Sequence, residues 1–135
     1  MATAIVEYLG NLRTEATHLK SGIKIITDAP TDNHGKGEAF SPTDLLSSSL
    51  ASCMLTIMGI SAKAHNITFN NAKIEVTKQM AENPRRVSGV ICKIQVKNEN
   101  YGEKEIRLLT AAALSCPVAK SLHPDIKQEV SFEWV

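Results

Sequence analysis

The sequence predicts an α+β fold in which antiparallel strands curve around one long buried helix. Three observations lead to this class. The stretch from Leu45 to Ala62 contains no charged residue, and short segments on both sides of it alternate polar and apolar residues between turn residues. Strands and helices do not alternate regularly, as a doubly wound parallel sheet would require. We expect one domain over residues 1–135.

The central helix is predicted over about residues 42–64. Ser41 is suited to the N-cap, Pro42 to the first helical position, and Asp44 places a negative charge in the first turn. Because the helix lacks a polar face, we expect the rest of the chain to enclose it. Six hydroxyl side chains within the uncharged run favour a buried protein helix over a membrane span.

The other elements follow from alternation and turn signals. Ser115-Cys116-Pro117 should interrupt the second helix, because proline has no amide hydrogen to donate and crowds the preceding turn. The predicted elements are a three-strand meander over about 3–27, a loop over 28–40, a hairpin over about 67–97, the second helix over about 103–122 and a last strand over about 126–135.

Composition excludes several classes of function. The formal net charge of +1 gives no basic surface for nucleic acid or an anionic membrane. The first residues lack the basic and apolar regions of a signal peptide. Three widely spaced cysteines do not form the disulfide framework of a secreted protein, so we expect a cytoplasmic protein with free or redox-active thiols.

Cys53 and Cys116 are the residues that suggest chemistry. Each lies on one of the two main helices, which must pack in the same core. Cys116 precedes a helix restart, where free amide donors would favour the thiolate, whereas Cys53 lies mid-helix and would need a nearby cation. Cys92 is in phase with the buried positions of its strand and is expected to fill the core. From the residues alone, core packing is also an alternative for Cys53 and Cys116.

The motifs around these two cysteines resemble those of the OsmC/Ohr family of osmotically induced and organic-hydroperoxide-resistance proteins. They are SPTDLL from Ser41, then Ala51-Ser52-Cys53, and AALSCPV over residues 112–118. The resemblance implies an intertwined homodimer with a site at the subunit boundary. It also implies a thiol peroxidase in which Cys53 attacks an organic hydroperoxide and Cys116 then forms a disulfide with it.

The same resemblance implies an activating arginine near the N-terminus, held by a glutamate in the first turn of the central helix. Arg13 matches the arginine, since it is the only one before that helix. Thr43-Asp44 occupies the place of the glutamate, and we interpret Asp44 as a helix-start charge. Glu15 or Glu38 would then be left to orient Arg13, and the sequence does not decide between them.

No cofactor or metal is expected, because the four histidines and three cysteines lack metal-ligand spacing. The expected reductant is a dithiol, either a small molecule or a lipoyl- or thioredoxin-like protein. Two alternative hypotheses remain. One is a protein of the same fold that binds a small apolar ligand without peroxidase activity, and the other is a purely structural or interaction role.

Overall fold

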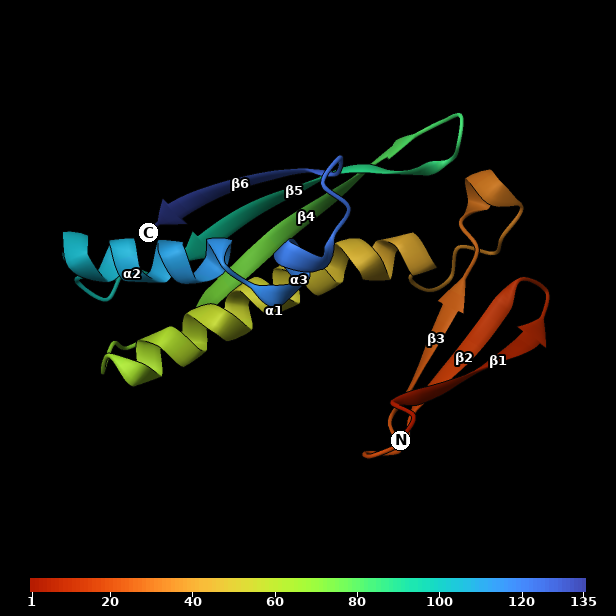
Figure 1. The fold of residues 1–135 in the computed structure, drawn as a ribbon, viewed down its shortest axis with the longest axis horizontal. Helices are drawn as coiled ribbons and strands as arrows, with labels where there is room; N and C mark the ends of the chain where they lie inside the picture. Colours follow the sequence, from red (N-terminus) through yellow and green to blue (C-terminus); the bar gives the residue numbers. More distant parts are fainter. The chain divides into compact units, whose positions relative to one another are not determined.

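A computed structural model describes all 135 residues and divides them into two compact units, Met1–Leu46 and Ser47–Val135. The first unit contains the predicted meander, formed by β1 (Ala4–Gly10), β2 (Arg13–His18) and β3 (Lys24–Asp28) (Figure 1). The strands pair antiparallel in the order β1-β2-β3. Gly10, with a φ of +88°, begins the turn between β1 and β2, in a conformation that glycine adopts without strain.

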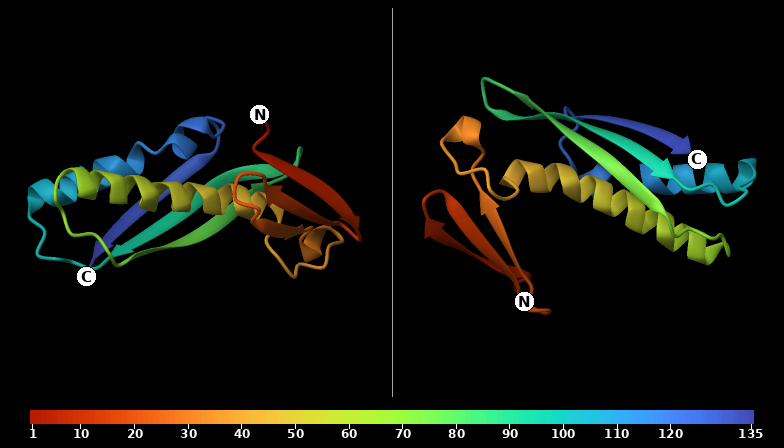
Figure 2. Two further views of the ribbon diagram at one scale, coloured as in Figure 1. Left: turned by 90° about the horizontal axis from the view of Figure 1, so that it is seen from below. Right: turned by 180° about the vertical axis from the view of Figure 1, so that it is seen from behind.

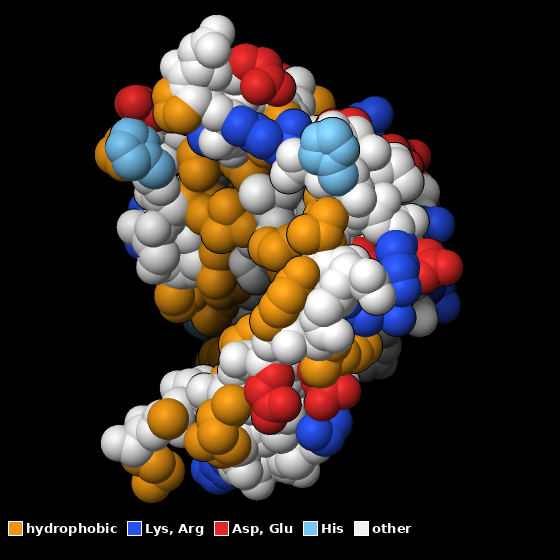
Figure 3. Space-filling view, turned by 90° about the vertical axis from the view of Figure 1, so that its right-hand side faces the viewer, with side chains coloured by type: hydrophobic (Ala, Val, Ile, Leu, Met, Phe, Trp, Pro, Cys, Tyr) orange, Lys and Arg blue, Asp and Glu red, His pale blue; other side chains and the backbone are white.

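The meander carries many exposed apolar side chains. Alternation in a strand normally places apolar residues on a covered face, but here they remain accessible within the chain. Figure 3 shows hydrophobic side chains at the surface on the face that it draws. The exposed apolar residues of the meander are Ile5, Val6, Tyr8, Leu9, Leu12, Leu19, Ile23 and Ile25.

The segment after β3 folds back on the end of that strand. Asp28, which the sequence places in the loop, is the last residue of β3, because it pairs with Arg13 of β2. Its amide donates to the Phe40 carbonyl. The loop includes a 3-10 turn, η1 (Thr31–Asn33). Gly35 passes so close to the Ala29 carbonyl that any Cβ would overlap it, so this turn requires glycine.

The central helix α1 (Pro42–Ala64) has the predicted bounds. It begins with a reciprocal cap: the Ser41 Oγ accepts a hydrogen bond from the Asp44 amide (3.0 Å), and the Asp44 carboxylate accepts one from the Ser41 amide (3.0 Å). This is a capping box with aspartate at the third position. Asp44 therefore acts at the helix start, as predicted. By length and composition alone α1 could also cross a membrane, but core helices of soluble proteins pass the same test.

The expectation that α1 is enclosed on all sides is wrong for the single chain. Its buried residues form one stripe at helical spacing, whereas Leu46 is 39% and Ile60 is 60% exposed. The exposed residues of the uncharged stretch 45–62 lie on the opposite side of the helix, at Leu46, Ser52, Thr56 and Ile60. The buried residues are Ser47, Leu50, Ala51, Met54, Met58 and Ala62.

The second unit places helices on one face of a three-stranded sheet (Figures 1 and 2). The second predicted helix ends before Cys116, as expected from Pro117. The hairpin strands begin later than predicted, since residues 67–71 lie outside the sheet. The elements are β4 (Ala72–Ala81), β5 (Arg86–Val96), α2 (Glu103–Leu114), α3 (Pro117–Ser121) and β6 (Lys127–Trp134).

The sheet is mixed and not wholly antiparallel. Strands β4 and β5 form the predicted antiparallel hairpin, but β6 pairs with β5 in parallel, with Cys92 opposite Val130. The reason is the connection: α2 and α3 carry the chain back across the sheet, so β6 starts at the same end as β5. Gln128 in β6 donates from Nε2 to the Ala119 carbonyl (3.0 Å) and fastens α3 to the sheet.

The core of the second unit lies between the sheet and its helices. Leu109 of α2 is fully buried in it, whereas Leu114 of the same helix is 49% exposed. Leu109→Ala is expected to lower the free energy of unfolding by about 2–5 kcal/mol, through lost burial and an unfilled cavity. Urea unfolding measures the change. Leu114→Ala is the matched control, and an equal loss in both variants would contradict this account of the core.

Candidate functional site

The second unit brings Cys53 and Cys116 together. Cys53 is half-buried in the third turn of α1, while Cys116 is fully buried at the N-cap of α3. Cys53 lies near enough to Cys116 to raise the pKa of that thiol. All three cysteines are free.

The expectation that its position would favour a Cys116 thiolate is wrong. Burial raises the pKa of Cys116, and its interaction with the neighbouring Cys53 raises it further. The Ala119 amide, which donates to the Cys116 sulfur at 3.4 Å, lowers the pKa but does not outweigh these effects. Cys116 therefore holds its proton at neutral pH.

Cys92 fills the core, as its phase in the strand predicts. It is fully buried in β5, and burial together with the negative charge of Cys116 raises its pKa to about 11. A thiol with so high a pKa is a poor nucleophile at neutral pH. Nowhere in the chain do three or more His, Cys, Asp or Glu side chains form a group suited to a metal ion.

The first unit contains a second cluster, which we call the arginine cluster: Arg13, Asp28 and Glu38. Arg13 donates from Nε and Nη2 to the two carboxylate oxygens of Asp28, at 2.7 and 2.8 Å. Nη2 also donates to Glu38 Oε1 at 3.1 Å. The Asp28 side chain is fully buried and that of Glu38 is 65% exposed. The guanidinium therefore donates two hydrogen bonds to the Asp28 carboxylate and one to the Glu38 carboxylate.

Asp28 is the member that sequence reasoning missed. Of the two carboxylates left open, Glu38 contacts Arg13, while Glu15 pairs with Lys24 at 3.1 Å. Asp28 lies directly opposite Arg13 in the β2–β3 ladder. A register centred on the turn before Gly22 would have revealed this pairing, since opposite charges on facing strand positions attract.

The arginine cluster should make the free energy of unfolding depend on pH. Hydrogen bonds from Arg13 lower the pKa of Asp28 despite its burial. A carboxylate with a depressed folded-state pKa stabilises the fold above its unfolded pKa of about 3.9, and this stability is lost as the pH falls through the folded value. Urea unfolding can be measured between about pH 6 and pH 2, the range over which carboxyl groups titrate. As the pH falls, the free energy of unfolding should decrease more steeply in the wild type than in Asp28→Asn. Parallel curves would contradict this prediction.

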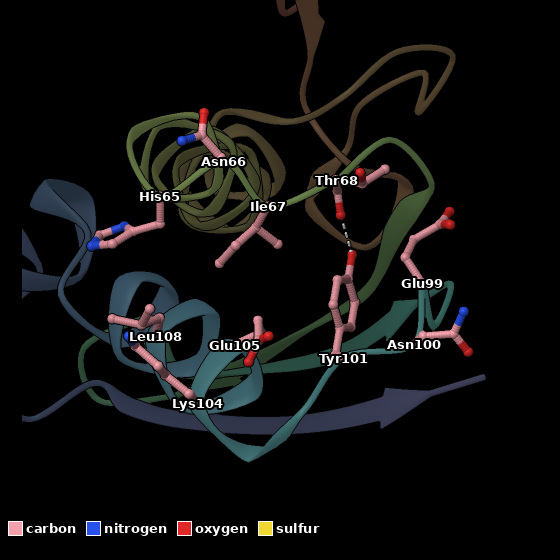
Figure 4. A pocket seen from close by; sticks show the side chains of 10 residues that line it. All are labelled: His65, Asn66, Ile67, Thr68, Glu99, Asn100, Tyr101, Lys104, Glu105 and Leu108. Atoms are coloured by element: carbon pink, nitrogen blue, oxygen red, sulfur yellow. Dashed lines mark hydrogen bonds between the residues drawn. The ribbon is translucent and has the colours of Figure 1, made fainter.

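A cavity of about 340 Å³ lies beyond the C-terminal end of α1, between that end and the start of α2 (Figure 4). Ile67, Leu108 and the Tyr101 ring line it together with charged and polar groups, and the Tyr101 hydroxyl donates to the Thr68 carbonyl. None of the three cysteines lines it. The lining also includes His65, Asn66, Glu99, Asn100, Lys104 and Glu105.

Comparison with known proteins shows the family of the chain. The family model described as OsmC-like protein matches residues 35–131 of the chain, a range that includes both cysteines of the pair. The chain belongs to the OsmC-like protein family. This OsmC-like chain has no match among curated proteins.

Solved structures agree with this assignment. The OsmC-like chain is 56% identical to a Psychrobacter arcticus 273-4 protein, provisionally named an osmotic stress induced and detoxification response protein, over 98% of this chain and 96% of that one (TM-score 0.94). The organic hydroperoxide resistance protein OsmC of Legionella pneumophila shares the fold at 18% identity, over 98% of both chains (TM-score 0.76). The OsmC like protein of Mycoplasma pneumoniae shares it at 21%, over 98% and 95% (TM-score 0.81). The α+β fold predicted from the sequence is therefore confirmed as the OsmC fold.

Proposed function

We propose that this protein is a thiol peroxidase that reduces organic hydroperoxides. The observation that supports the proposal is the nearness of the two sulfurs, since Cys53 raises the pKa of the buried Cys116 thiol. Cys53 packs against the hydrophobic core, and apolar surroundings suit an organic hydroperoxide better than hydrogen peroxide.

The reaction has three steps. The Cys53 thiolate attacks the O–O bond of the hydroperoxide, forms a sulfenic acid and releases an alkoxide, which takes a proton to give the alcohol. The Cys116 sulfur then attacks the sulfenic acid, forming the Cys53–Cys116 disulfide and releasing water. A dithiol, either a small molecule or a lipoyl- or thioredoxin-like protein, restores both thiols by exchange and leaves as its own disulfide.

Arg13 is proposed as the cation that stabilises the Cys53 thiolate. At an unperturbed pKa near 8.5 only about 3% of a thiol is ionised at pH 7, and a nearby arginine lowers such a pKa by about 1–3 units. The guanidinium is permanently charged and is already held in a fixed orientation by Asp28. This role is inferred from the resemblance to the family and from that fixed orientation.

We also propose that the protein is a cytoplasmic homodimer. The exposed apolar residues of the meander, and Leu46 and Ile60 on the uncovered side of α1, are surfaces that a second copy would cover. Sedimentation velocity should give the mass of two chains. A monomer at all accessible concentrations would contradict the dimer without affecting the thiol chemistry.

The function is tested by titrating the reduced protein with cumene hydroperoxide. We expect two thiols to be lost per chain, cumyl alcohol to form in equal amount to the peroxide consumed, and peptide mapping to find Cys53 joined to Cys116. Cys92 should remain a free thiol. Unreacted Cys53 after exposure to excess hydroperoxide would refute the proposal.

A further inference from the structure

The two carboxylates of the arginine cluster hold Arg13 in different ways. Asp28 is fully buried and accepts from two guanidinium nitrogens, whereas Glu38 is 65% exposed and accepts from one. Paired hydrogen bonds to a buried carboxylate fix the plane of a guanidinium. A single contact with an exposed side chain is weak and easily exchanged with water.

Asp28 also organises the loop that follows its strand. Its Oδ2 accepts from the Glu38 amide at 3.1 Å, and its own amide donates to the Phe40 carbonyl at 3.1 Å. The residue thus joins β2, β3 and the loop that leads to α1. Asp44, by contrast, is engaged in the helix cap with Ser41.

We propose that Asp28 is the positioning residue for Arg13. Asp44, the carboxylate in the first turn of α1, is engaged in the helix cap and leaves this role to another residue. Asp28 acts through Arg13 and not on the substrate. The inference rests on the proposed function, because Arg13 is taken there as the cation that acts on Cys53.

Two roles of Asp28, as a nearby negative charge or as the residue that positions Arg13, predict opposite effects of Asp28→Asn on the ionisation of Cys53. If Asp28 were only a nearby negative charge, its removal would favour the Cys53 thiolate and lower the midpoint of its ionisation. If Asp28 positions Arg13, its removal frees the guanidinium and raises that midpoint. The direction of the shift therefore separates the two roles.

The experiment measures the rate of Cys53 alkylation by iodoacetamide against pH, read on the Cys53 peptide by mass spectrometry. Asp28→Asn should raise the midpoint by about one pH unit, the lower end of what an arginine contributes, and reduce kcat/KM for cumene hydroperoxide about tenfold. In an Arg13→Ala background Asp28→Asn should have no further effect, because the two residues act as one unit.

Glu15→Gln is the matched control. Glu15 lies on β2, as Arg13 does, but it pairs with Lys24. This substitution should leave the midpoint of Cys53 alkylation and kcat/KM unchanged. Arg13→Lys keeps the charge but loses the paired contact, so it should resemble Asp28→Asn even if that variant folds poorly. A lowered or unchanged midpoint in Asp28→Asn, wild-type behaviour of Arg13→Lys, or additive effects in the double variant would each overturn the inference.

Failure of the proposed function gives a different result. If the wild type does not reduce hydroperoxides, turnover is absent from every variant, but the alkylation midpoints still report whether Asp28 acts on Cys53 through Arg13. Normal turnover with no midpoint shift in Asp28→Asn would instead overturn the positioning role alone.

Discussion

Cys53→Ser is expected to abolish hydroperoxide reduction. A serine hydroxyl is not ionised at neutral pH and is a poor nucleophile toward the O–O bond, so kcat/KM should fall by at least about a thousandfold, as when other covalent enzymes lose their nucleophile. The substitution is small and lies at a half-buried position, so the fold should persist. Coupled consumption of a dithiol with cumene hydroperoxide as substrate measures the loss.

Cys92→Ser is the matched control for that variant. It makes the same chemical change at a sulfur whose pKa is about 11 and which lies outside the reacting pair. It should reduce stability, because a hydroxyl enters the core, but leave turnover within about threefold of the wild type. If Cys92→Ser lost activity while Cys53→Ser kept it, the assignment of the attacking sulfur would be wrong.

Cys116→Ser should stop the reaction after its first step. Cys53 would still be oxidised to the sulfenic acid, but no neighbouring thiol would condense with it. Replacing a positioned thiol with a reductant from solution should lower steady-state turnover by about a hundredfold or more, given the high effective concentration of held groups. Dimedone labelling of Cys53 after one equivalent of hydroperoxide would detect the intermediate.

The wild type provides the comparison for this second variant. Its sulfenic acid should be captured rapidly by Cys116, which lies near Cys53, so dimedone labelling should be low. Equal labelling of both proteins, or undiminished turnover in Cys116→Ser, would show that Cys116 does not resolve the intermediate.

Local signals in the sequence predicted the elements well. The cap residues Ser41 and Asp44 set the start of α1, and Pro117 separated α2 from α3. The parallel pairing of β6 was not predictable in the same way, because alternation along a strand is identical for both directions of its neighbour. The one-sided burial of α1 was missed for a related reason. A helical stretch without charged residues indicates that its surface is buried in the functional state. It does not indicate how much of that surface is buried by the same chain.

In the candidate site, too, local features were predictable from the sequence and features that depend on tertiary structure were not. Phase along a strand was enough to predict that Cys92 is buried. The pairing of Asp28 with Arg13 depends on register, which a shift of one residue would have changed completely. The pKa of Cys116 was misjudged because helix-start amides can be seen in the sequence, whereas the burial that outweighs them comes from tertiary packing.

The crossover that makes β6 parallel to β5 also bears on the newly made chain. Cys116 lies within that crossover, and α3 is fastened to the sheet by Gln128 of the final strand. During synthesis on the ribosome, Cys53 therefore emerges long before its partner can be seated against it. The proposed redox pair is therefore completed only after β6 has been made, so a product truncated before Cys116 would carry the proposed attacking sulfur without its proposed resolving one.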